Sequence, residues 1–155
     1  MSQYAKTTAV SSEQRRTEIE RTLRRYGATG FAYGWDQSHA SVMFEMERRR
    51  VRFKLPMPNP QDKEFTHTPD RGLKRSRDAA DKAYEQAVRQ RWAALSLVIK
   101  AKLEAIEAGI STLDEEFLAH LVLPDGSTVA ERTIPQLDAA YAGQALPALL
   151  PGGAR

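Results

Sequence analysis

Residues 40–57 read ASVMFEMERRRVRFKLPM, with a cluster of arginines between two runs of alternating apolar and polar side chains. A period of two residues is the period of a strand that buries one of its faces. The stretch therefore predicts a β-hairpin with an apolar inner face and arginines at its tip. The inward positions are Ala40, Val42, Phe44 and Met46 before the arginines, and Val51, Phe53, Leu55 and Met57 after them.

The register of this hairpin is predicted by requiring apolar residues to oppose apolar residues on the inner face and acidic residues to oppose basic residues on the outer face. When opposed residue numbers add up to 97, Phe44 faces Phe53 inside and Glu45 faces Arg52 outside. This register puts Arg48-Arg49 in a two-residue turn, a kind that favours Asn-Gly or other glycine-containing pairs. A longer loop with a slipped register is the alternative. The same register also opposes Val42 to Leu55, Met46 to Val51 and Glu47 to Arg50.

The segment before the hairpin adds a third strand and a helix. Phe31, Tyr33 and Trp35 alternate with small residues, and Asp36–His39 has turn composition, so residues 29–57 predict a three-stranded antiparallel meander. Upstream, residues 12–27 predict a helix that Ser11 or Ser12 caps and Gly27 ends. Its buried stripe is Ile19, Thr22, Leu23 and Tyr26, and we expect residues 1–11 to be a polar arm.

A long helix is predicted after the meander. Three prolines from Pro56 to Pro60 end the last strand, and residues 58–75 have the composition of a loop. Residues 76–108 then keep a helical period up to Gly109. From Trp92 onward the helix is apolar on several sides, so we expect the sheet and the later helices to wrap its second half.

Two or three short helices are expected over residues 112–142, followed by an apolar tail at residues 143–155. Thr112 with Glu115 forms a capping box, and Pro135 suits the first turn of the last helix. The chain is therefore predicted to be one α+β domain over residues 1–155.

Composition excludes several classes of protein. The chain has 155 residues, of which 41% are apolar and 28% charged, as in ordinary globular proteins. It has no cysteine, which excludes disulfides, thiolate metal sites and a thiol nucleophile. It has neither an apolar signal segment nor an apolar run long enough to cross a membrane, so we expect a cytoplasmic protein without a membrane partner.

The net charge of +3 hides two halves of opposite sign. Residues 1–77 hold 16 Lys and Arg against 9 Asp and Glu, a balance of +7, whereas residues 78–155 hold 7 against 11, a balance of −4. Clustered basic side chains are typical of surfaces that contact phosphates. Exposed arginines at a turn that only deter strand pairing, or an acidic protein partner, are the alternatives. The candidate nucleic-acid-binding residues are Arg48, Arg49, Arg50, Arg52, Arg71, Lys74, Arg75 and Arg77.

Other candidate chemistry is weaker. The three aromatic residues of the first strand could stack nucleic-acid bases, but they are needed for the core. Glu116 and His120 have a metal-ligand spacing without a third ligand, and Pro69-Asp70 and Pro124-Asp125 lack the rest of a nuclease motif. We therefore expect no catalytic residue, metal or cofactor, and keep a metal-dependent nuclease only as an activity to test.

Five segments of the chain, over about residues 12–150, belong together: ERTLRRYGATGFAYGW, VRFKLPMP, EFTHTP, YEQAVRQRWAALSLVIKAKLEAIEAGI and EEFLAHLVLPDGSTV. They resemble a family of short uncharacterised proteins of bacteriophages, prophages and other mobile elements. The resemblance implies a bacterial host cell and assigns no site residue. We expect a non-enzymatic accessory protein that binds nucleic acid, DNA above all. The alternative is an inhibitor or modulator of a host defence or DNA-processing enzyme, and a homo-oligomer is compatible with either.

Overall fold

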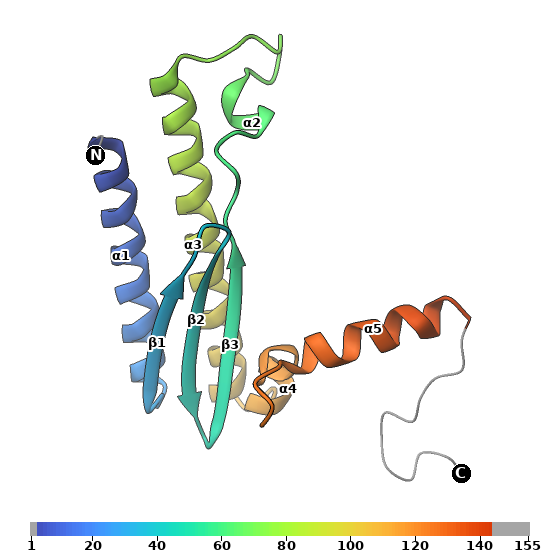
Figure 1. Ribbon diagram of the computed structural model, residues 1–155. Helices are drawn as coiled ribbons and strands as arrows, with labels where there is room; N and C mark the ends of the chain where they lie inside the picture. The colour runs from blue at the N-terminus through green and yellow to red at the C-terminus, as the bar shows by residue number, and fades with distance from the viewer. Residues whose placement is uncertain (1–2, 144–155) are drawn as a thin grey trace.

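The computed structural model describes the backbone of residues 3–143 and the side chains of residues 13–143. It has the α+β architecture predicted from the sequence, with an N-terminal helix, a three-stranded antiparallel sheet, a long helix and short C-terminal helices (Figure 1). The elements in chain order are α1 (Gln3–Arg25), β1 (Gly30–Trp35), β2 (His39–Met46), β3 (Arg49–Pro56), α2 (Lys63–Thr66), α3 (Arg77–Glu107), α4 (Leu113–Phe117), the 3-10 helix η1 (Leu118–His120) and α5 (Val129–Tyr141).

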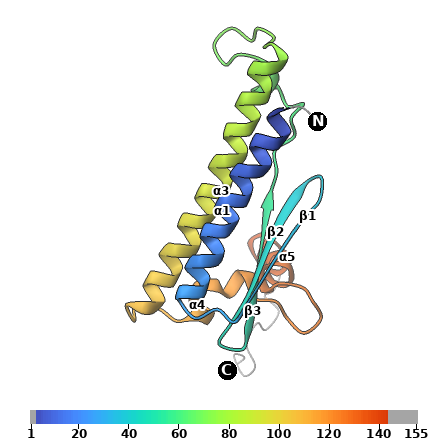
Figure 2. The same cartoon turned by 90° about the vertical axis from the view of Figure 1, so that its left-hand side faces the viewer.

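The sheet has the order β1-β2-β3, and α1 and α3 lie side by side against one of its faces (Figures 1 and 2). The core lies between these two layers. Trp92 of α3 is 1% exposed, and its ring centroid is 5.6 Å from that of Tyr33 on β1. At the far end of α3, Phe117 packs edge-on against Phe44 and Phe53. The predicted contact between the meander and the long helix is confirmed.

The helix α1 begins earlier than predicted. Its backbone is helical from Gln3, so the polar arm expected at residues 1–11 is wrong from that residue on, and Ser11 and Ser12 lie inside the helix. No glycine or proline occurs between residues 3 and 25 to break it. The predicted end is confirmed, because Gly27 has φ 100° and the next amide donates to the Leu23 carbonyl at 3.0 Å.

The hairpin has the predicted faces in a different register. Opposed residues of β2 and β3 add up to 95, so Phe44 faces Val51 and Glu45 faces Arg50. The predicted pairs that add up to 97 are wrong because the two-residue turn is Glu47-Arg48. A slide of two residues keeps every apolar side chain on the same face, because the side-chain period of a strand is two.

The long helix matches its predicted bounds and, in part, its predicted surroundings. Ser76 caps α3 by accepting from the Ala79 amide at 3.3 Å, and Gly109 follows with φ 74°. However, Leu97 and Val98 are exposed, so the expectation that the sheet and the later helices wrap the second half holds for one side of the helix only. The sheet, α1 and α4 cover the sides that carry Trp92, Leu95, Ile99 and Leu103, and the opposite side stays open.

The loop before α3 and the start of α5 also differ from their predictions. Within the expected loop 58–75, the short helix α2 buries Phe65 against Tyr84, with ring centroids 5.5 Å apart. Thr128 and Glu131 form a capping box that starts α5 six residues before Pro135, which was expected in the first turn. The predicted tail lies outside the described residues from residue 144 on. Within residues 3–143, no helix is long and apolar enough to cross a membrane.

The replacement Trp92→Ala tests the core. Removing a fully buried indole should lower the free energy of unfolding by about 3–5 kcal/mol. Trp35→Ala is the matched control, because Trp35 is 75% exposed at the end of β1; it should change that free energy by only about 0.5 kcal/mol. Denaturant melts of both variants measure the difference. Equal losses would contradict the packing described here.

Candidate functional site: the hairpin groove

A groove of about 1020 Å³ lies where the β2–β3 turn, α4, η1 and the loop before α5 meet. We call it the hairpin groove. Its lining combines charged and apolar side chains. The charged residues are Glu45, Glu47, Arg48, Arg49, Arg50 and Asp114, and the larger apolar ones are Leu118, Leu121, Val122, Leu123, Pro124 and Val129.

The turn at the end of the groove has an unusual backbone. Glu47 and Arg48 have φ values of 49° and 64°, as in the left-handed type I′ turn that joins two-residue hairpins. A left-handed conformation costs a residue with a Cβ atom roughly 1–2 kcal/mol, which is why glycine and asparagine usually occupy such turns. The turn places Arg48 at the tip, and Arg49 and Arg50 begin β3.

Two hairpin arginines bind carboxylates of their own chain. Arg49 donates from Nε and Nη2 to the two oxygens of Asp114 at 2.9 and 3.2 Å. These hydrogen bonds lower the pKa of the Asp114 carboxyl below its usual value. Arg50 donates from the same two nitrogens to Glu45 Oε1 at 3.2 and 2.8 Å. Both pairs are about half exposed, so phosphate groups would have to displace them.

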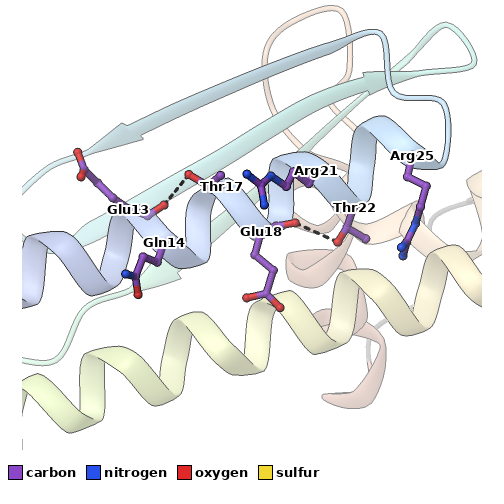
Figure 3. A pocket seen from close by; sticks show the side chains of 7 residues that line it. All are labelled: Glu13, Gln14, Thr17, Glu18, Arg21, Thr22 and Arg25. Carbon is purple, nitrogen blue, oxygen red and sulfur yellow. Dashed lines mark hydrogen bonds between the residues drawn. The ribbon is translucent and has the colours of Figure 1, made fainter.

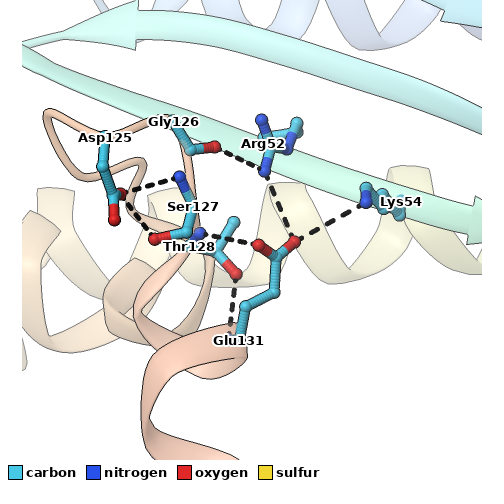
Figure 4. A network of polar contacts seen from close by, with 7 residues as sticks. All are labelled: Arg52, Lys54, Asp125, Gly126, Ser127, Thr128 and Glu131. Atoms are coloured by element: carbon cyan, nitrogen blue, oxygen red, sulfur yellow. Dashed lines mark hydrogen bonds and ion pairs between the residues drawn. The ribbon is translucent and has the colours of Figure 1, made fainter.

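A third arginine holds the start of α5 against the sheet (Figure 4). Arg52 donates to the Gly126 carbonyl at 3.0 Å and to Glu131 Oε1 at 3.4 Å, and Lys54 reaches the same carboxylate oxygen at 3.6 Å. The hydrogen bond from the Thr128 amide is the largest cause that lowers the pKa of Glu131. The positive charges of Lys54 and Arg52 lower it further. Because its side chain is only 18% exposed, Arg52 supports the fold rather than an open surface.

The other predicted basic residues lie at the opposite end of the molecule. Arg71, Lys74, Arg75 and Arg77 precede or begin α3, whereas the hairpin turn lies near its C-terminal end (Figure 1). A 31-residue helix is about 46 Å long. Arg75 also donates to two carbonyls of α2, each at 3.3 Å. The eight candidate residues therefore form two separate groups and no single basic surface.

The candidate metal pair also has other contacts. Glu116 accepts from Lys102 Nζ at 2.8 Å through its main-chain carbonyl and not through the carboxylate, and the His120 ring stacks on Phe53 with centroids 4.0 Å apart. Burial, followed by the charge of Lys102, lowers the pKa of His120 below 6.5. A hydrogen bond from the ring to the Arg52 carbonyl raises this pKa and offsets part of the effect. Nowhere in the described part of the chain do three His, Asp or Glu residues gather as metal ligands would.

A second groove runs along α1 beside α3, and each residue that lines it has a polar or charged side chain (Figure 3). It has about 650 Å³, and all its lining residues belong to α1, among them Glu18, Arg21 and Arg25. The hydroxyls of Thr17 and Thr22 donate to carbonyls one turn earlier in the same helix. Since its lining comes from a single helix, this groove has the character of an ordinary helix surface.

Sequence reasoning found the arginines of the hairpin groove and missed its apolar lining. The run FLAHLVLP at residues 117–124 is more apolar than a short surface helix requires, and that excess was the available signal. Leu118, at 53% exposure, belongs to this run. Comparisons with protein-family models, curated proteins and solved structures found no match to this chain. The resemblance to mobile-element proteins therefore stays a prediction.

The lowered pKa of His120 gives a pH dependence of stability. Below pH 6.5 the unfolded chain binds a proton at this histidine more readily than the folded chain does, so the free energy of unfolding should fall as the pH falls through that range. In His120→Gln this part of the slope should disappear. His67→Gln, in the segment between α2 and α3, is the control and should keep it. Denaturant melts between pH 7.5 and about pH 5 measure the slope; an unchanged slope in His120→Gln would refute the assignment.

Proposed function

We propose that this protein is a non-enzymatic binding protein that holds a segment of another protein in the hairpin groove. The observation that carries the proposal is the pairing of the groove's arginines. Arg49 and Arg50 already bind Asp114 and Glu45, which leaves a lining of balanced charge around apolar side chains. A phosphate-binding surface needs uncompensated positive charge, whereas protein interfaces combine apolar contacts with a polar rim.

The lining suggests the chemistry of the bound segment. Leu118 is a large apolar side chain left half exposed beside Leu121 and Val122, so apolar residues of a partner would gain by covering it. Arg48 and its neighbour Glu47 form no ion pair with any charged side chain of residues 13–143, so the turn offers a partner one cation and one anion, and a carboxylate of the partner can bind Arg48. We therefore propose an amphipathic segment with apolar residues and at least one carboxylate.

The cellular location and the class of partner that we propose are taken from the sequence resemblance. We place the binding in the cytoplasm of a bacterial host, where the partner would be a host defence or DNA-processing enzyme whose activity the protein modulates. The support is the combination of a protein-type groove with the resemblance to phage and mobile-element proteins.

A random dodecamer peptide library tests the groove. The wild-type protein should enrich peptides that combine apolar and acidic residues, and Leu118→Asp should weaken binding of the enriched peptides at least about tenfold, the effect of about 1.4 kcal/mol. Leu73→Asp is the matched control, because Leu73 is 58% exposed at the other end of the molecule and outside the groove. Failure to enrich any peptide, or equal binding by both variants, would refute the proposal.

Nucleic-acid binding is the second candidate, with a smaller surface than the sequence suggested. Arg71, Lys74 and Arg77 are exposed before or at the start of α3 and form no ion pair with a carboxylate among the residues described. This group could neutralise DNA phosphates without breaking an internal pair.

The salt dependence of DNA binding separates the two candidates. If the group before α3 binds DNA, replacing Arg71, Lys74 and Arg77 by alanine should reduce the slope of log affinity against log salt by up to about three units, at roughly 0.9 per phosphate. Replacing Arg48, Arg49 and Arg50 by alanine should change this slope less, since two of them are paired. Gel-shift titrations of single- and double-stranded DNA at several salt concentrations measure it. No wild-type shift at low salt would exclude this candidate.

A further inference from the structure

The two outer edges of the sheet differ in what covers them. The edge of β3 is occupied by the segment after η1. The Val122 amide donates to the Arg50 carbonyl at 2.8 Å, and Leu121 forms a β-bridge with Val51. The edge of β1 has no such neighbour among residues 13–143 (Figure 1). In the part of the chain that the structure describes, β1 is therefore the open edge of the sheet.

The register shows which main-chain groups of β1 point outward. Beside the turn to β2, the Asp36 amide donates to the His39 carbonyl at 2.8 Å. Hydrogen-bonded positions alternate along an antiparallel strand, so the even-numbered residues of β1 direct their main-chain groups to β2. The groups that point away from the sheet form no hydrogen bond with residues 13–143. We call them the β1 edge, and they are the N–H and C=O groups of Phe31, Tyr33 and Trp35.

The β1 edge lacks the features that usually protect edge strands. Natural sheets block such edges with charged side chains, proline or bulges. The sequence of β1, GFAYGW, has no charged residue and no proline, and its six residues pair with β2 one to one. Six residues extend over about 20 Å, the length of an ordinary strand. The edge therefore offers main-chain donors and acceptors at the spacing that an extended chain requires.

The flank of α1 indicates which side chains such a chain would carry. Beside the start of β1, a groove of about 240 Å³ is lined in part by Ala28 and Phe31. Two charged residues also line it, but they pair with each other at 3.1 Å, so the groove favours an uncharged side chain; they are Glu20 and Arg24.

Further along β1 the flank of α1 carries a positive charge. The Arg16 guanidinium lies over the Tyr33 ring, 4.2 Å from its centroid. Its ion-pair partner Glu13 is 3.7 Å away, which is a long contact. A carboxylate opposite Tyr33 would therefore bind Arg16.

We propose that the β1 edge binds an extended segment of another protein as a fourth strand of the sheet. Main-chain hydrogen bonds hold the segment, and alternate side chains select it. The side chain opposite Phe31 is apolar, and the side chain opposite Tyr33, two positions away on the same face, is a carboxylate. A second copy of β1 does not fit, because β1 has no acidic residue to offer Arg16. The lining of the small groove shares only Thr29 with the hairpin groove.

A random dodecamer peptide library, selected on the Leu118→Asp protein, tests this edge separately from the hairpin groove. The enriched peptides should carry a carboxylate two positions from an apolar residue. Methylating their main-chain amides one at a time should weaken binding about fivefold or more at every second position, because only alternate amides of an added strand face β1. Failure to enrich peptides of this pattern, or an effect of methylation without that alternation, would overturn the proposal.

Proline variants test the edge from the side of the protein. Trp35→Pro removes one outward N–H at a position where an edge strand accepts proline, and it should bind the enriched peptides about fivefold or more weakly. Gln37→Pro is the matched control, because Gln37 lies in the β1–β2 turn at a position that suits proline, outside the edge. Circular dichroism shows whether both variants are folded. Equal binding by the two variants would overturn the proposal, and so would a wild-type dimer in sedimentation equilibrium that Trp35→Pro dissociates.

Discussion

The packing of α3 across one face of the sheet, centred on Trp92, is the contact on which the rest of the structure depends. The three-stranded sheet has one apolar face, and α3 with α1 covers that face and removes it from water, which is the main source of stabilisation in a fold of this kind. Because α3 is long, it also fixes the distance between its two ends. The loop that enters it and the hairpin near its other end are therefore far apart, although both are rich in arginine.

Much of the fold could be predicted because the side-chain periods of the sequence determine it. The alternation of residues 40–57 placed Val42, Phe44 and Phe53 on the buried face, and they stay there despite the change of register. The register itself depended on the turn, where Glu47 and Arg48 adopt a conformation that their residue types disfavour. Propensity rules gave no reason to choose that turn, since the energy that compensates it comes from the ladder as a whole.

The site was harder to predict because electrostatic partners lie far apart in the sequence. Arg49 binds Asp114, 65 positions later, and Arg52 binds Glu131, 79 positions later. Counting arginines could not show that these carboxylates neutralise them. The same long-range packing brings residues 118–129 to the hairpin and so creates the apolar part of the groove. A cluster of charge in a sequence thus became a balanced surface in the fold.

The separation between α1 and α3 in the chain also bears on how the protein folds during synthesis. The buried stripe of α1, with Ile19 and Leu23, is covered by a helix that ends 82 residues after α1 does. At roughly 5–20 residues per second, a ribosome needs about 4–16 s to make that stretch. During this interval the nascent α1 has no α3 to pack against. Its surface ion pairs, Arg15 with Glu18 and Arg24 with Glu20, are local and can form before α3 is made.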